Sequence, residues 1–201
     1  MKRAKKGLAA LLSVCMLLSL LPVTVFAEET PAADTLEEAA QPTTVEKTLA
    51  EMFADAQDGE TLRLEQDVTV TGQEDADYKN SGTVTLDLNG HTITGDNKNI
   101  ALRAIGTEAG KGTLKITNGT IKTNSGTYCT VGAKDAALEL SDMRLENSTA
   151  YGCSVKAFAG GTIDLKKVCS TSQTGGGVEA AGGTVNIYDS TFTQTGYYDH
   201  N

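Results

Sequence analysis

Two carboxylates, Glu139 and Asp164, stand out in the sequence as residues that could do chemistry. Each lies between two apolar residues of a short alternating segment, so both side chains are expected on the outer face of neighbouring strands. One strand spacing of about 5 Å would give the separation that retaining glycosidases use for a nucleophile and an acid–base group. Nothing in the neighbouring sequence singles out either residue as an acid or a base. A solvated, charge-matched face is therefore the interpretation we favour.

Tyrosines are the second group with a chemical use, because exposed aromatic faces commonly hold sugars. The chain has no Trp, but Tyr128 and Tyr151 fall at corresponding places in consecutive loops, and Tyr188 has an outward position in a later strand. These residues predict a shallow glycan platform. The alternative is that the rings pack at the corners of the fold.

An acidic loop at residues 72–82 suggests calcium, because Glu74, Asp75 and Asp77 could supply oxygen ligands. Lys79 stands where a further oxygen ligand would be needed, and no terminal Glu follows. A solvated acidic loop therefore explains the segment better than calcium, and we expect no cofactor. The two histidines are far apart in the sequence, and His91 has no acid, base or metal partner within its own segment, so we also expect no zinc site.

Cysteines offer one further kind of chemistry. Cys129 and Cys153 each stand two residues before a Val in equivalent segments, so they are expected to stack about 5 Å apart on neighbouring strands. That separation allows a disulfide, but stacked side chains could equally remain a pair of buried thiols. Cys169 has no partner in this pattern.

A repeat of apolar residues supplies the elements that must position these groups. Paired apolar residues recur in six segments: 61–66, 85–90, 113–121, 137–145, 162–170 and 184–192. A second series lies between them: 101–104, 130–133, 154–157 and 177–180. A repeat with a period near 25 residues and two series of short strands predicts a parallel β-helix of about five to six coils, in which like residues stack. The residues expected to form one outward column are Arg63, Asp87, Lys115, Glu139, Asp164 and Asn186.

A short amphipathic helix is predicted just before the repeat, within residues 43–59. Thr43 and Glu46 have the spacing of a capping box, and apolar residues recur at helical spacing from Val45 to about Gln57. Because the open end of a solenoid exposes apolar residues and unpaired backbone, this helix is expected to cap the N-terminal coil.

The course LDLNGHTI (86–93), together with its repeats, resembles right-handed parallel β-helix proteins of the pectin-lyase-like kind, especially secreted bacterial ones. The resemblance extends from Thr61 to the C-terminus. It implies a right-handed coil with three sheets. It carries over no catalytic residue, because no segment matches a lyase or polygalacturonase active-site motif.

The N-terminal residues predict secretion. A basic start, MKRAKK, precedes an apolar run that ends in Val25-Phe26-Ala27, which is the pattern of a signal peptide over residues 1–27. The run is long enough that an uncleaved anchor is the alternative. Cleavage would remove four of the 17 basic residues and leave 13 − 26 = −13, a charge that argues against nucleic acid as a partner. After cleavage we expect no membrane span.

The remaining chain divides into an acidic linker over residues 28–42, the capping helix over 43–59 and the β-helix over 60–201. The last segments carry no recognisable cap, so we expect the C-terminal edge to be covered by further coils or by a partner. These features favour a secreted or cell-surface, adhesin-like module that binds extracellular polysaccharide or host glycan, or is structural, without catalysis. The alternative is a polysaccharide lyase or glycoside hydrolase whose active face lies in later coils.

Overall fold

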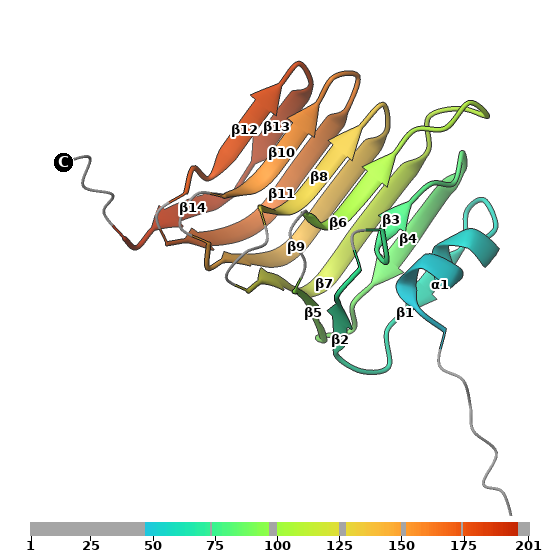
Figure 1. Ribbon diagram of the computed structural model, residues 1–201, viewed down its shortest axis with the longest axis horizontal. Helices are drawn as coiled ribbons and strands as arrows, with labels where there is room; N and C mark the ends of the chain where they lie inside the picture. The colour runs from blue at the N-terminus through green and yellow to red at the C-terminus, as the bar shows by residue number, and fades with distance from the viewer. Residues whose placement is uncertain are drawn as a thin grey trace, which may run out of the picture. The chain divides into compact units, whose positions relative to one another are not determined.

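The computed structural model describes residues 47–72, 74–96, 100–124, 128–149, 152–173 and 175–196. In this part the chain forms an all-β parallel solenoid of about five turns with one short helix near the N-terminus (Figure 1). The fold class predicted from the repeat is confirmed. The elements are α1 (Leu49–Asp55), β1 (Thr61–Arg63), β2 (Val68–Val70), β3 (Asp77–Tyr78), β4 (Thr83–Asp87), β5 (Thr92–Gly95), β6 (Ile100–Ile105), β7 (Thr113–Thr123), β8 (Cys129–Lys134), β9 (Ala137–Asn147), β10 (Cys153–Phe158), β11 (Thr162–Ser172), β12 (Val178–Ala181), β13 (Thr184–Tyr188) and β14 (Thr191–Gln194).

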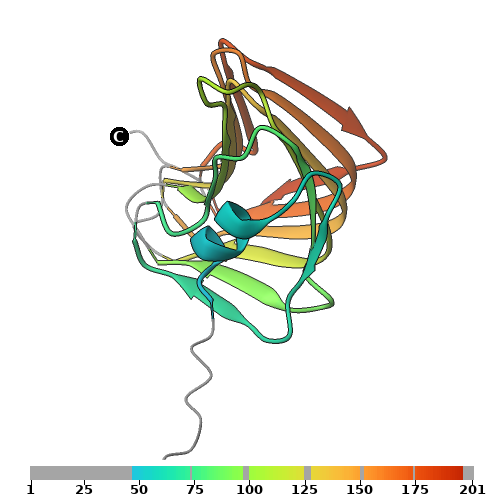
Figure 2. The ribbon, with the colours of Figure 1, turned by 90° about the vertical axis from the view of Figure 1, so that its right-hand side faces the viewer.

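All strand pairs in the solenoid are parallel, and they form two sheets. The larger sheet follows the order β1-β4-β7-β9-β11-β13, with β2, β5 and β14 attached beside it, and the smaller sheet follows β12-β10-β8-β6-β3. The long strands β7, β9 and β11 bend at Asn118, Asp142 and Lys167, which have φ of 60°, 53° and 54°. The larger sheet therefore has two faces, and the coil has three sides (Figure 2). We call the β1/β4/β13 side face 1, the β2/β5/β14 side face 2 and the smaller sheet face 3.

The core consists of columns of like residues, one from each coil. On face 1, Leu86 pairs with Ile116, which pairs with Leu140, and each is at most 1% exposed. On face 3, Val131 and Val155 are register neighbours, and the next inward positions are all Ala. Each coil buries its inward apolar side chains against those of the neighbouring coils. This burial contributes about 25 cal/mol per Å² of apolar surface removed from water, so the stacking of coils stabilises the fold.

The structure corrects one register that the sequence suggested. Leu86 lies beside Ile116 rather than Leu114, so Thr85 lies beside Lys115 and Asp87 beside Thr117. The single outward column expected from the sequence is thus two columns: Thr61, Thr85, Lys115, Glu139, Asp164 and Asn186 form one, and Arg63, Asp87, Thr117, Ser141, Lys166 and Tyr188 form the other.

The cause of this shift is the corner that follows β4. Asn89 and Gly90 both adopt positive φ, 52° and 84°, whereas the next coil turns the same corner with Asn118 alone. The segment from Leu86 to Ile93 is two residues longer than the matching segment from Ile116 to Ile121. The corner takes up these two residues, because Ile93 still pairs with Ile121 on face 2.

Helix α1 begins later than the sequence suggested. Thr48 is its N-cap: the Glu51 amide donates to Thr48 Oγ1 at 3.3 Å, and the Thr48 amide donates to the Glu51 carboxylate at 2.7 Å. The prediction of a start near Val45 was wrong because this second Thr-x-x-Glu sequence forms the capping box. Leu49 and Phe53 enter the core at the N-terminal end, as a cap requires. Thr43 and the predicted signal peptide and linker lie outside the described residues.

We predict that Gly119→Ala lowers the free energy of unfolding by about 2 kcal/mol, because an added methyl group would overpack the inside of the corner. Its Cβ would lie 2.5 Å from Leu88 Cβ and 2.6 Å from the His91 carbonyl oxygen. Urea unfolding followed by circular dichroism measures the change.

Gly176→Ala is the matched control, because a Cβ there meets nothing within 4 Å. Its stability should change by no more than about 0.5 kcal/mol. Equal stability of the two variants would contradict the packing described for Gly119.

A second prediction concerns Tyr78, which packs edge-on against Phe53 at a centroid distance of 5.6 Å and donates to the Gly82 carbonyl oxygen at 2.5 Å. Burial raises the pKa of Tyr78 to about 12. The unfolded chain loses this proton first, at its ordinary pKa of about 10. The contribution of the neutral Tyr78 phenol to the free energy of unfolding is therefore complete below pH ~10, and it is lost as the pH rises toward about 12.

Stability measured across this alkaline range should fall more steeply for the wild type than for Tyr78→Phe. Parallel curves for the two proteins would contradict the assigned burial of the phenol.

Candidate functional site

The carboxylates Glu139 and Asp164 are register neighbours on the outer side of face 1. Each already has a polar partner. Lys115 Nζ lies 3.0 Å from the Glu139 carboxylate, and Asn186 Nδ2 donates to Asp164 at 2.6 Å. Both belong to a ladder of partly exposed polar residues, in which Glu139 interacts with the preceding coil and Asp164 with the following one. This geometry is that of a solvated, charge-matched face.

Tyr128 and Tyr188 do not lie on one surface. Tyr128 directly precedes β8 of face 3 and is 44% exposed, whereas Tyr188 ends β13 of face 1 and is 56% exposed. Tyr151 lies outside the described residues. A platform that includes both Tyr128 and Tyr188 is therefore excluded by their positions on different sheets.

The acidic loop holds its carboxylates with cations and amides. Asp77, on β3, accepts from Arg103 at 2.7 and 2.6 Å and lies 3.4 Å from Lys79, and its side chain is only 3% exposed. Glu74 pairs with Lys79 at 2.9 Å, an interaction that also lowers the pKa of Glu74. Asp75 accepts from the Gly72 amide at 2.6 Å. A hollow of about 600 Å³ separates this loop from α1.

No group of three or more His, Cys, Asp or Glu side chains among the described residues could hold a metal ion. His91 pairs with a residue of another coil: its Nδ1 lies 3.4 Å from the Asp67 carboxylate. The Thr92 amide and, to a lesser extent, His91 hold the pKa of Asp67 below its usual value.

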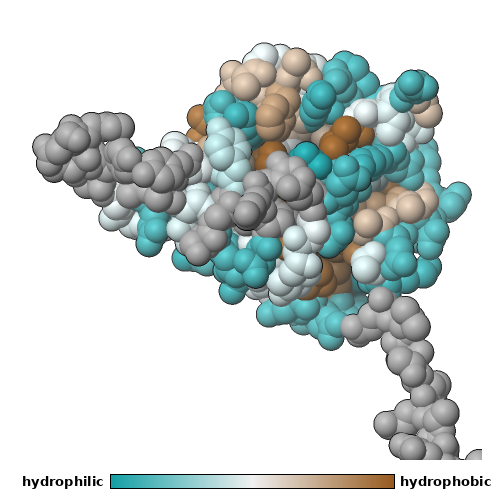
Figure 3. Space-filling model, in the orientation of Figure 1, coloured by the Kyte–Doolittle hydropathy of each residue, from teal (hydrophilic) through white to brown (hydrophobic). Residues whose placement is uncertain are grey.

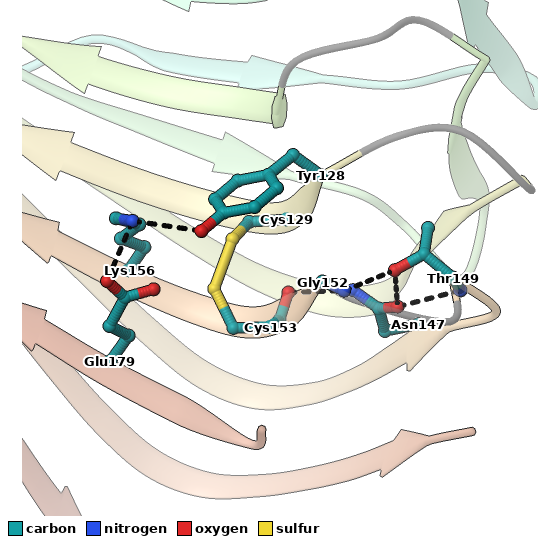
Figure 4. The surroundings of a disulfide bond; sticks show 8 residues. All are labelled: Tyr128, Cys129, Asn147, Thr149, Gly152, Cys153, Lys156 and Glu179. Carbon is teal, nitrogen blue, oxygen red and sulfur yellow. Dashed lines mark hydrogen bonds and ion pairs between the residues drawn. A yellow bond between two sulfur atoms is a disulfide. The ribbon is translucent and has the colours of Figure 1, made fainter. Parts of the chain in front are cut away.

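Cys129 and Cys153 form a disulfide between the first residues of β8 and β10, with Cα atoms 4.8 Å apart (Figure 4). Of the two states that the sequence left open for this pair, the structure contains the disulfide. Both residues are at most 5% exposed and, with Ile100 and Phe158, form a small apolar cluster separate from the main core. Cys169 is free and exposed on face 2.

A β-bulge explains why the disulfide is separate from the core. The amides of Ser154 and Val155 both donate to the Gly177 carbonyl oxygen, at 3.1 Å each, and both side chains are fully buried. Two consecutive residues thus face inward, and Cys153 is shifted to the outer side of face 3. The sequence contains no residue type that announces this bulge, so strict alternation places Cys153 and Val155 on the same side.

Next to the disulfide lies a charged cluster that the sequence did not reveal. Lys156 Nζ lies 2.8 Å from the Glu179 carboxylate, 3.3 Å from Tyr128 Oη and 4.8 Å from the centre of the Tyr128 ring (Figure 4). Its hydrogen bond to Glu179 is the main reason that the pKa of Lys156 is raised. The only signal in the sequence is that Lys156 and Glu179 occupy equivalent positions in consecutive repeats. The cluster ties β8, β10 and β12 together across face 3.

A shallow, open groove of about 280 Å³ lies on face 2. It crosses β7, β9 and β11 near the ends of these strands, and its lining includes Lys122, Arg144, Glu146, Ser148, Thr171 and Gln173. Lys122, Glu146 and Thr171 are register neighbours, one from each coil. Arg144 Nε donates to Glu146 at 2.6 Å. The sequence analysis missed this groove, because its residues look like ordinary outward positions until three coils are superimposed.

On the side seen in Figure 1, apolar residues form small separate patches within a largely hydrophilic surface (Figure 3). The exposed large hydrophobic residues in the described ranges are Tyr128, Ile187 and Tyr188. No helix of the described part is long and apolar enough to cross a membrane.

Comparison with known proteins adds no family to this picture. No protein-family model matches the chain, and neither a curated protein nor a solved structure shows significant similarity to it.

We predict that replacing both bridged cysteines, Cys129→Ala with Cys153→Ala, lowers the free energy of unfolding by about 3 kcal/mol. The bond closes a loop between residues 24 positions apart, and that loop would gain entropy in the unfolded chain. Thermal unfolding of the double variant measures the loss.

Cys169→Ala is the control and should leave the stability within about 0.5 kcal/mol of the wild type. Alkylation in denaturant without reductant should leave Cys129 and Cys153 unmodified. Modification of both residues under those conditions would contradict the disulfide.

Proposed function

We propose that the chain is a secreted or cell-surface β-solenoid that binds extracellular polysaccharide or host glycan in the groove on face 2, without catalysing a reaction on the described coils. The resemblance to secreted bacterial β-helix proteins of the pectin-lyase-like kind fits this proposal.

The observation that carries the proposal is the groove itself. It extends over three consecutive coils and presents donors on Lys122 and Arg144, an acceptor on Glu146, and an amide on Gln173 that does both. A polymer lying along the solenoid axis would meet a new polar side chain about every 4.8 Å. Repeated weak contacts of this kind suit a repeating ligand.

Two further observations support an extracellular location. Disulfides persist mainly in oxidising compartments, and the chain contains one between Cys129 and Cys153. The N-terminal 27 residues have the pattern of a signal peptide.

The enzymatic alternative is a lyase or glycosidase. Within the described coils, the adjacent Glu139 and Asp164 favour it, whereas the pairing of Glu139 with Lys115 and of Asp164 with Asn186 speaks against it. Both carboxylates are thus already engaged by neighbouring side chains of the same face.

The test is binding of the purified mature protein to polygalacturonate, alginate, xylan and mannan by affinity electrophoresis. We expect retardation by at least one of these polymers and a dissociation constant about tenfold higher for Arg144→Ala, since a lost charge-assisted hydrogen bond costs at least about 1.5 kcal/mol.

Lys166→Ala removes the same charge from the exposed surface of face 1 and should bind like the wild type. Equal weakening by both variants would show non-specific electrostatic attraction. Release of new reducing ends or unsaturated uronides, abolished by Asp164→Asn, would replace the binding proposal with the enzymatic one.

A further inference from the structure

Two hydroxyl groups inside the solenoid are without a hydrogen-bond partner in the part of the chain that the structure describes. They belong to Thr130 on β8 and Ser154 on β10, and both residues are fully buried. A buried hydroxyl without a partner destabilises the folded state, so two of them at neighbouring positions call for a physical explanation.

The bulge of face 3 is the reason that these hydroxyls point inward. Ser154 and Val155 are consecutive inward residues, and Thr130 and Val131 occupy the same positions one coil earlier. The alternation that would have placed a polar side chain outside is broken at this point in both coils. The hydroxyls therefore come from the same structural device that moves the disulfide to the outer side.

The spacing of the two neighbouring strands at this point is compatible with one bridging water molecule. The preceding residues of each strand, Cys129 and Cys153, have Cα atoms 4.8 Å apart, and the hydroxyls do not bond to each other directly. A water molecule at a hydrogen-bond length of about 2.8 Å from each oxygen can bridge a separation of up to about 5.6 Å. Both hydroxyls can donate as well as accept, so the water would have the two polar partners that a buried site requires.

The flanking coils limit the site to this pair. The same column continues to Ala101 on one side and to Gly177 on the other, neither of which has a polar side chain. Neither residue can therefore satisfy the hydroxyls of Thr130 and Ser154 through its side chain. Phe192 of β14 lies next to Gly177, since its Cδ1 is 3.1 Å from the position that a Cβ on Gly177 would occupy.

We infer that one ordered water molecule is bound inside the solenoid, bridging Thr130 Oγ1 and Ser154 Oγ. It links β8 to β10 from within the wall whose outer side carries the disulfide. This water site is independent of any ligand in the groove on face 2.

The sign of the change in melting temperature caused by Thr130→Val distinguishes a site that holds water from a dry site. If water bridges the hydroxyls, the variant loses that bridge and leaves Ser154 without a partner, and the melting temperature should fall by about 3 °C. If the site is dry, removal of an unpaired hydroxyl at constant shape should raise the melting temperature, which would overturn the inference.

Ser170→Ala is the matched control. Its hydroxyl is equally buried and unpaired in the described structure, but its register neighbours are Leu145 and Phe192, which offer no second hydroxyl. This variant should keep or raise the melting temperature. An equal fall in both variants would show that the loss at Thr130 is not due to a bridge.

A crystal structure of the wild-type protein at atomic resolution provides the direct readout. It should show a density peak within about 3 Å of both hydroxyl oxygens, and the peak should be absent from Thr130→Val. A wild-type map without this peak would refute the inference whatever the variants do.

Discussion

The fold depends on one constraint: each coil must place its inward apolar residues directly over those of the coil before it. Parallel strands about 4.8 Å apart allow backbone hydrogen bonds and side-chain packing to be satisfied together only when this register holds. The columns around Leu86, Ile116 and Leu140 show the register on face 1, and Val131 and Val155 show it on face 3. Where the number of residues per coil varies, the corners and loops must absorb the difference. The corner at Asn89 and Gly90 does so for two residues.

Outer positions are released from this constraint, and they carry the features that differ from coil to coil. The bulge in β8 and β10 changes which side of the sheet the neighbouring side chains occupy. It keeps Val155 in the core and places Cys153 in a cluster on the other side of the sheet. The disulfide and the contacts of Lys156 with Tyr128 and Glu179 then join three strands from outside. On face 2, outward side chains of three consecutive coils line an open groove.

The sequence predicted the features that depend on local alternation and on spacing. The pairs Leu138/Leu140 and Ile163/Leu165 stack as their patterns indicate, because adjacent coils of equal corner length leave one register. The first residue of α1 could not be predicted from the sequence, since Thr43 with Glu46 and Thr48 with Glu51 fit the capping box equally well. The register after Leu86 could not be read either, because sequence spacing does not reveal how many residues a corner absorbs. The groove on face 2 depends on which outward residues of three coils coincide, which follows only once every register is known.

The central functional claim is that face 2 is the side that meets a glycan. Backbone amide chemical shifts of the ¹⁵N-labelled protein, recorded during titration with a soluble oligosaccharide of the polymer that retards it most, test this claim directly. The account predicts shift changes that cluster at Lys122, Arg144 and Gln173 and decline toward faces 1 and 3. Changes confined to the surface around Tyr128 on face 3 or Asp164 on face 1, or no changes at saturating ligand, would contradict it.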